Sequence, residues 1–216
     1  MSQAVARSPL TIWGRANSVN VQKVLWCCDE LGLSFERIDA GLHFGRTREP
    51  GYLALNPNAR VPTLVDEDFV LWESNTILRY LAQKYGADTE LYPADLRHRA
   101  IADKWLDWTL STYAPVERDL YWSLIRTEAN KRDKSAENRL AEQLSSFWQM
   151  LASDLDDRQY IGGEAFSIAD ICLGAFARRW FGFEGLEKPS LPALASWFEK
   201  VSGRPGFQRH LTTPMT

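Results

Sequence analysis

The stretch "VPTLVDEDFVLWESNTILRYLAQKYG", Val61 to Gly86, carries the pattern that decides the fold. Two apolar runs flank the acidic turn Asp66–Asp68, which predicts a β-hairpin. A helical pattern follows directly, with Ser74 as a suitable N-cap and Gly86 as a stop. Its apolar face is formed by Ile77, Leu78 and Leu81. The sequence therefore predicts a hairpin joined to a helix.

The segment before the hairpin alternates strand and helix patterns. Residues Pro9–Trp13 and Ser34–Asp39 read as strands, with a helix from about Ser18 to Leu31 between them and Gly32 as its C-cap. The polar run "GLHFGRTREP" after the second strand reads as a loop or an irregular helix. The resulting order, β-α-β-loop-β-β-α, predicts an α/β domain over residues 1–86.

The pattern changes near residue 86. A turn-rich linker over 87–96 leads into residues 97–216, where only helical periodicity is found. The predicted apolar faces include Ile101, Trp105, Trp108, Leu144, Trp148, Leu173, Phe176, Trp180, Leu194 and Trp197. Ser167 and Asp170 match a capping box, which we interpret as the start of a helix. We therefore expect an all-helical second domain.

Composition narrows the function classes. The 216 residues are 45% hydrophobic and include nine tryptophans, enough for a substantial core. A net charge of −3 and a pI of about 5.7 argue against nucleic acid or an anionic membrane as the main partner. No apolar run approaches the ~18 residues of a membrane span.

Cysteine usage indicates a reducing compartment. Cys27, Cys28 and Cys172 are odd in number and form no CxxC, so they do not make a disulfide framework. The first fourteen residues, "MSQAVARSPLTIWG", lack the apolar core of a signal peptide. Together these features predict a cytoplasmic protein.

Three short stretches place polar groups where elements meet. Ser18 and its neighbours Asn17 and Asn20 precede the first helix, whose unpaired N–H groups favour an anion, although a simple N-cap explains Ser18 equally well. Val61–Pro62 starts a strand; cis X–Pro bonds are only about 5–6% of the total, so the residues alone do not predict one. Glu73–Ser74 repeats the strand-to-helix arrangement.

The order and spacing of these stretches resemble the cytosolic glutathione S-transferase family. The resemblance covers nearly the whole chain and rests on the polar loop, "NPNARVPTL", "LWESNTILRYLAQKY", "FSIADI" and "RPGF". It implies a thioredoxin-like N-terminal domain, an all-helical C-terminal domain, glutathione as cosubstrate without a metal, and a homodimer.

The resemblance also assigns binding roles. It implies that the backbone of Val61, before a cis Pro62, pairs with the cysteinyl part of glutathione, and that Glu73 and Ser74 hold its γ-glutamyl end. Arg60 matches a position that contacts the glutathione backbone. The glycine carboxylate falls to His43 or Arg60, and His43 reads equally well as a solvated loop residue.

The catalytic residue is left open among three candidates. The loop has no Tyr and no Cys, which disfavours the Tyr-type and Cys-type classes. Counted back from Lys23–Val24, Ser18 falls on the catalytic serine of theta- and zeta-like enzymes. Asn20 matches the asparagine of the bacterial Nu class, and Asn17 remains a competitor.

A pocket for the electrophile is expected between the domains. Its candidate lining residues are Trp13, Phe44, Trp108, Tyr113, Trp180 and a polarising Arg178 or Arg179. Tryptophans at helical spacing are more often core residues. The leading function is conjugation of small hydrophobic electrophiles; a disulfide or hydroperoxide reductase and a non-catalytic interaction module are the alternatives.

Overall fold

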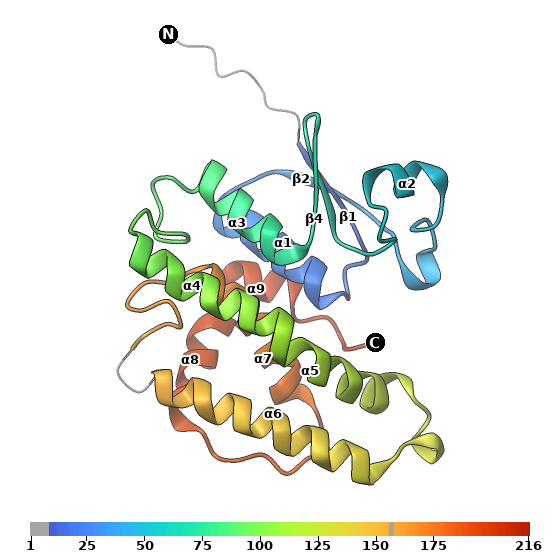
Figure 1. Ribbon diagram of the computed structural model, residues 1–216, viewed down its shortest axis with the longest axis vertical. Helices are drawn as coiled ribbons and strands as arrows, with labels where there is room; N and C mark the ends of the chain where they lie inside the picture. The colour runs from blue at the N-terminus through green and yellow to red at the C-terminus, as the bar shows by residue number, and fades with distance from the viewer. Residues whose placement is uncertain (1–8, 156–157) are drawn as a thin grey trace.

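The computed structural model describes residues 9–155 and 158–216 and divides them between a small sheet domain and a larger helical domain (Figure 1). Most of the N-terminal stretch assessed for a signal peptide, residues 1–8, lies outside the described residues. None of the described helices is long and apolar enough to cross a membrane.

The sheet is built from four short strands of the described residues. They are β1 (Leu10–Trp13), β2 (Phe35–Ile38), β3 (Thr63–Asp66) and β4 (Phe69–Trp72), in the spatial order β2-β1-β3-β4. β1 and β2 are parallel, as a crossover through α1 (Val19–Glu30) requires, whereas β3 is antiparallel to both β1 and β4. This is the predicted thioredoxin-like arrangement.

Helices cover both faces of this sheet. α1 and α3 (Ser74–Tyr85) lie between the sheet and the helical domain (Figure 1). On β1, Ile12 is fully buried on one face, and Trp13 points to the other and packs edge-on against Tyr52, at 5.7 Å between ring centroids. Tyr52 belongs to α2 (Pro50–Leu55), which with η1 (Leu42–Phe44) occupies the segment expected to be a loop or irregular helix.

The described part of the second domain contains helices and one isolated β-bridge, Tyr160–Gly163. Its elements are α4 (Leu96–Trp108), η2 (Thr109–Tyr113), α5 (Ala114–Tyr121), η3 (Trp122–Arg126), η4 (Ala129–Lys131), α6 (Lys134–Leu155), α7 (Ile168–Gly182), α8 (Pro192–Ser202) and α9 (Pro205–His210). η2 and η3 are π-helical turns on either side of α5, and such turns are frequent at functional sites.

The predicted capping box is present at the start of α7. The Ser167 hydroxyl accepts from the Ala169 N–H at 3.3 Å, and Asp170 accepts from the Ser167 N–H at 2.8 Å. The Asp170 carboxylate also accepts from the Trp197 indole of α8 and from the Ile161 N–H, both at 2.9 Å. The motif therefore joins α7 to α8, a structural role.

Trp26 connects the two domains. This fully buried side chain of α1 lies so close to α7 that a Cβ on Gly174 would be 3.1 Å from its ring, and Phe207 of α9 meets it edge-on at 5.3 Å. Glu30 accepts from the Trp26 indole at 2.8 Å and from Arg204 at 2.6 and 2.9 Å. The "RPGF" stretch therefore fastens α9 to α1.

A buried lysine lies at the same junction. Lys23 of α1 is fully buried; its ammonium donates to Asn75 Oδ1 at 2.7 Å and lies 3.9 Å from Cys172 Sγ. Burial lowers the pKa of Lys23, because the charged form loses its hydration. Lys23 and Asn75 therefore link α1, α3 and α7 through polar contacts.

The cysteines are packing residues. Cys27, Cys28 and Cys172 are all free and fully buried. Burial raises the pKa of Cys28 to about 12 and the pKa of Cys27 well above its usual value. Neither of these two thiols is set up to form a reactive thiolate.

Candidate functional site

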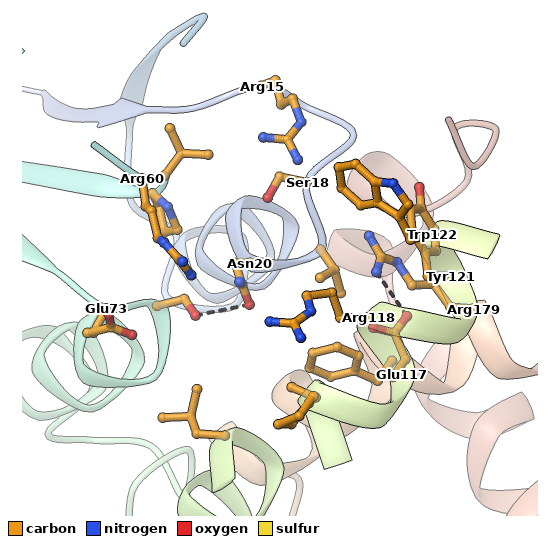
Figure 2. A pocket seen from close by; sticks show the side chains of 18 of the residues that line it. Arg15, Ser18, Asn20, Arg60, Glu73, Glu117, Arg118, Tyr121, Trp122 and Arg179 are labelled. Carbon is orange, nitrogen blue, oxygen red and sulfur yellow. Dashed lines mark hydrogen bonds and ion pairs between the residues drawn. The ribbon is translucent and has the colours of Figure 1, made fainter. Parts of the chain in front are cut away.

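A cavity of about 340 Å³ opens between the two domains (Figure 2). One side, which we call the sheet-side wall, is formed by Asn56, Asn58, Arg60, Val61, Pro62, Glu73 and Ser74. The opposite side, the helix-side wall, is formed by Leu110, Ala114, Pro115, Glu117, Arg118, Tyr121, Trp122, Arg126, Phe176 and Arg179. Between the walls, the start of α1 contributes Arg15, Ser18, Val19 and Asn20.

Ser18 is the N-cap of α1 and faces the cavity. Its backbone is extended, with φ −83° and ψ 122°, as an N-cap requires, but its hydroxyl makes no capping hydrogen bond. The side chain is therefore in the capping position without serving the helix. It is only 5% exposed, so a group bound beside it meets the hydroxyl and the helix N-terminus largely away from water.

Asn20 joins the start of α1 to the start of α3. The Ser74 hydroxyl donates to Asn20 Oδ1 at 3.3 Å, as the dashed line in Figure 2 shows. Because Asn20 Oδ1 accepts this bond, the Nδ2 group is the part of the amide that can act as a donor. Ser18 and Asn20 both line the cavity.

Glu73 occupies a backbone conformation that few residues adopt. Its φ is +71°, in the left-handed region, and it is the N-cap of α3, one residue before the N-cap predicted from the sequence. Such a conformation costs about 1–3 kcal/mol in a non-glycine residue and persists where the surroundings enforce it. The strain coincides with a side chain that lines the cavity.

The Val61–Pro62 peptide bond is cis, as the family resemblance implies. The preceding carbonyl, that of Arg60, accepts from Asn56 Nδ2 at 3.0 Å, and the same amide donates to Thr63 Oγ1 at 3.1 Å. The Asn56 side chain therefore fixes the backbone just before β3 and the first residue of that strand. Both Val61 and Pro62 line the cavity.

Arginines dominate the helix-side wall. Arg179 pairs with buried Glu117 at 2.9 Å and lies 3.7 Å over the ring of Tyr121. Burial raises the pKa of Glu117, and the Arg179 charge opposes that shift. Arg126 stacks over Trp122 at 4.8 Å. The pKa of Arg15 is lowered by burial and then by repulsion from Arg126 and Arg179.

One candidate catalytic residue, Asn17, and one expected glutathione-binding residue, His43, lie away from this cavity. Asn17 is not among the lining residues; its amide nitrogen donates to Thr216 Oγ1. His43 lies on η1, exposed and packed against Phe44 at 4.0 Å, and does not line the cavity. The structure thus brings together Ser18 and Asn20 but not Asn17.

Of the residues expected around the electrophile, only Arg179 lines the cavity. Trp13 contacts α2, and Phe44 lies on η1. Tyr113 and Trp180 belong to the core, where each packs against Trp148, and Trp108 packs against Trp105, Tyr113 and Phe147. Arg178 donates to the Thr213 carbonyl instead. The core interpretation therefore applies to Tyr113 and Trp180, whereas Phe44 is 40% exposed.

Most residues of the helix-side wall were not predicted from the sequence. Glu117 and Tyr121, and likewise Arg118, Trp122 and Arg126, recur every four residues along one helical stretch. This i, i+4 stripe of charged and aromatic side chains was the available signal. Arg15 left no such signal, because it belongs to an irregular loop.

Comparison with known families identifies both halves of the chain. Residues 8–83 match the model described as "Glutathione S-transferase, N-terminal domain", and residues 101–205 match "Glutathione S-transferase, C-terminal domain". The chain belongs to the glutathione S-transferase family. The family resemblance and the fold class predicted from the sequence are therefore confirmed.

Individual relatives agree. Glutathione S-transferase GstB of Escherichia coli strain K12 is 35% identical over 209 residues, covering 96% of this chain and 100% of that protein. Glutathione S-transferase 3 of Zea mays is 32% identical, covering 94% and 93%. A crystal structure of the theta class glutathione S-transferase from Xanthomonas axonopodis pv. citri with glutathione bound is 43% identical, with a TM-score of 0.92 and coverage of 97% and 100%.

These relatives show that the protein is a transferase. Within the described residues, no group of three or more His, Cys, Asp or Glu side chains is arranged to hold a metal ion.

Proposed function

We propose that this transferase binds glutathione in the cavity and stabilises its thiolate for attack on a small electrophile. The observation that carries the proposal is the Ser18 hydroxyl, uncommitted at the N-terminus of α1 and facing the cavity between the two walls. The cysteinyl part of glutathione pairs with the Val61 backbone, which brings its sulfur toward Ser18.

The energetics require no general base. A thiol with a pKa near 8.5 is mostly protonated at neutral pH, and lowering the pKa by about 2 units takes about 2.7 kcal/mol of preferential thiolate stabilisation. One hydrogen bond to a charged group supplies about 1.5–3 kcal/mol, and a helix N-terminus adds about 0.3–1 kcal/mol. Ser18, with Asn20 Nδ2 as a second donor, is sufficient.

The sheet-side wall offers partners for the rest of glutathione. The Glu73 carboxylate accepts from the γ-glutamyl ammonium, and the first turn of α3 at Ser74 meets the γ-glutamyl carboxylate. Arg60 is exposed and lines this wall, whereas His43 lies on η1 outside the lining, so Arg60 is the better candidate for the glycine carboxylate.

Conjugation follows once the thiolate is formed. The sulfur attacks an electrophilic carbon, a C–S bond forms, and the leaving group departs with the electron pair of the broken bond. A disulfide reductase activity that uses a protein thiol has no support, because all three cysteines are fully buried. Any reduction would have to use the thiol of glutathione itself.

Calorimetry and kinetics test the proposal. We expect glutathione to bind in a calorimetric titration, and Ser18→Ala to lose most of the turnover of an aryl halide. Asn17→Ala is a matched control, because the Asn17 amide serves Thr216 and lies outside the lining. Full activity in Ser18→Ala together with loss in Asn20→Ala would transfer the thiolate contact to Asn20.

We also propose that the protein is a cytoplasmic homodimer with a role in detoxification. In support of the dimer, Phe44, Phe69 and Trp72 of the sheet domain are 40%, 45% and 37% exposed, which is unusual for side chains of this size. Light scattering that gives twice the chain mass would support the dimer, and Phe44→Ser should then weaken it. A monomer at all concentrations would contradict it.

A further inference from the structure

The charges of the cavity are distributed unequally. Five arginines and two glutamates line it, and only Arg60 and Glu73 belong to the sheet-side wall. Figure 2 shows Arg179 on the side away from Glu73, Arg15 above Ser18, and the Arg118 guanidinium beside Asn20. Arg126 completes this group beside Trp122. The part of the cavity that would receive the electrophile is therefore cationic.

Two of these four arginines are already neutralised. Arg179 forms its buried ion pair with Glu117 at 2.9 Å, and Arg118 pairs with neighbouring Asp119 at 3.0 Å. Arg118 is 66% exposed, so water screens it as well. Neither arginine requires a further anion.

Arg15 and Arg126 differ from them. Within residues 9–155 and 158–216, no side-chain carboxylate pairs with either guanidinium. Arg126 donates to the main-chain oxygen of Thr216, the last residue of the sequence, at 3.1 Å, whereas only the Arg15 Nε–H of the two guanidiniums is buried without a partner in the described residues. A buried donor without an acceptor is costly, and mutual repulsion raises the cost further. An anionic ligand would remove both penalties.

The aromatic residues of the helix-side wall set the shape of that site. Trp122 carries Arg126 on its face and is 53% exposed, and Phe176 lines the same wall. They provide apolar surface for the body of a small molecule, while the guanidiniums provide donors for its charged end.

We propose that the electrophiles of this transferase carry an anionic group, a carboxylate or a sulfonate, which Arg15 and Arg126 bind. This rests on the proposed function, because the electrophilic carbon must lie beside a thiolate held at Ser18. The thiolate sulfur forms the new C–S bond, a halide leaves with the electron pair, and the anionic group is unchanged. The arginines act by binding substrate.

A matched pair of aryl chlorides tests the proposal. We would compare 4-chloro-3-nitrobenzoate with 4-chloro-3-nitrobenzamide, dividing each kcat/KM by the uncatalysed rate with glutathione to correct for ring activation. The benzoate should be favoured about tenfold or more, a preference that declines as added salt screens the guanidiniums. The benzamide should respond little to salt.

Variants locate the effect. Arg15→Gln and Arg126→Gln should each lower the corrected benzoate value about tenfold while changing the benzamide value less than about threefold. Arg99→Gln is the matched control, because Arg99 also stacks over an aromatic ring, Tyr92 at 4.6 Å, but does not line the cavity. Circular dichroism melting would confirm that each variant is folded.

The outcomes separate the two proposals. Glutathione binding and benzamide turnover without a benzoate preference would overturn the anionic class and leave the proposed function intact. Equal losses of kcat/KM on both substrates, with a raised KM for glutathione, would mean that the arginines bind glutathione. That result would also overturn the proposed anionic class of electrophile. Absence of glutathione binding would overturn the proposed function itself.

If both aryl chlorides are turned over slowly, binding of their products can test the anionic preference instead. The preformed glutathione conjugates of the two compounds can be titrated by calorimetry. Tighter binding of the carboxylate conjugate, lost in Arg15→Gln and Arg126→Gln, supports the proposal. Equal affinities contradict it.

Discussion

The two walls of the cavity are built by different means. The sheet-side wall relies on backbone: a cis peptide at Val61–Pro62, a left-handed Glu73 and the first turn of α3. The helix-side wall relies on side chains that recur along α5 and η3, with arginines stacked on Tyr121 and Trp122. A backbone site is fixed by the fold, whereas a side-chain site changes with single substitutions. The difference suits the proposed function, in which glutathione binds the sheet-side wall and the electrophile binds the helix-side wall.

The largest effect is expected at the buried ion pair of the helix-side wall. Glu117→Leu should lower the free energy of unfolding by about 3–5 kcal/mol, because it leaves the Arg179 charge buried without its partner. The double variant Glu117→Leu/Arg179→Met should recover most of the loss. Denaturant melts of both proteins measure this, and a double variant as unstable as the single one would show that packing, not charge, maintains the wall.

Ser18 lies between the walls and should give the next largest effect. Ser18→Ala should raise the pKa of the thiol of bound glutathione. At pH 7 it should remove about 1.5–3 kcal/mol of transition-state stabilisation, which lowers kcat/KM roughly tenfold to a hundredfold. The loss should shrink as pH rises through the thiol pKa, because the thiolate then forms unaided. Thiolate absorbance against pH measures the shift, and an unchanged titration would exclude the hydroxyl.

Glu73 tests whether backbone strain and binding can be separated. Glu73→Gly should stabilise the free protein by up to about 1 kcal/mol, since glycine adopts φ +71° freely, while KM for glutathione rises with loss of the carboxylate. Glu73→Asn, which also tolerates this conformation, is the control. Thermal melts and KM values distinguish the two effects. A destabilised glycine variant would mean that Glu73 has a structural partner at this turn.

The smallest effect is expected at Arg118. Because Asp119 and solvent offset its charge, Arg118→Gln should change the free energy of unfolding by less than about 0.5 kcal/mol. Benzoate turnover should decrease less than in Arg15→Gln or Arg126→Gln. A loss as large as theirs would show that partnered arginines of the helix-side wall also bind substrate.

The elements of the sheet domain could be predicted from local sequence patterns. The hairpin, the helix after it and the capping box at Ser167–Asp170 depend on neighbours within a few residues, so the sequence predicted them. The N-cap of α3 was misplaced by one residue, because a left-handed Glu73 is not expected of a glutamate. Ser18 and Glu73 lie at strand-to-helix boundaries and Val61 lies just before a strand, positions that the sequence pattern marks.

The helix-side wall could not be predicted in the same way. Which face of α5 meets the cavity depends on how the helices pack, so the i, i+4 stripe along α5 and η3 does not by itself indicate a cavity wall. Tryptophans were therefore expected in the pocket although Trp180 is only 2% exposed and packs in the core. Arg15 depends on a loop conformation that no pattern indicates.

Trp26 makes the boundary between the two domains a poor place to divide this protein. Its indole belongs to the first domain by sequence but fills the core of the second, against Gly174 and Phe207. An isolated sheet domain would expose this large apolar ring, and an isolated helical domain would retain the hole it fills. The sheet domain and the helical domain should consequently unfold in one thermal transition. What sequence comparison describes as two modules is, in thermodynamic terms, one cooperative unit.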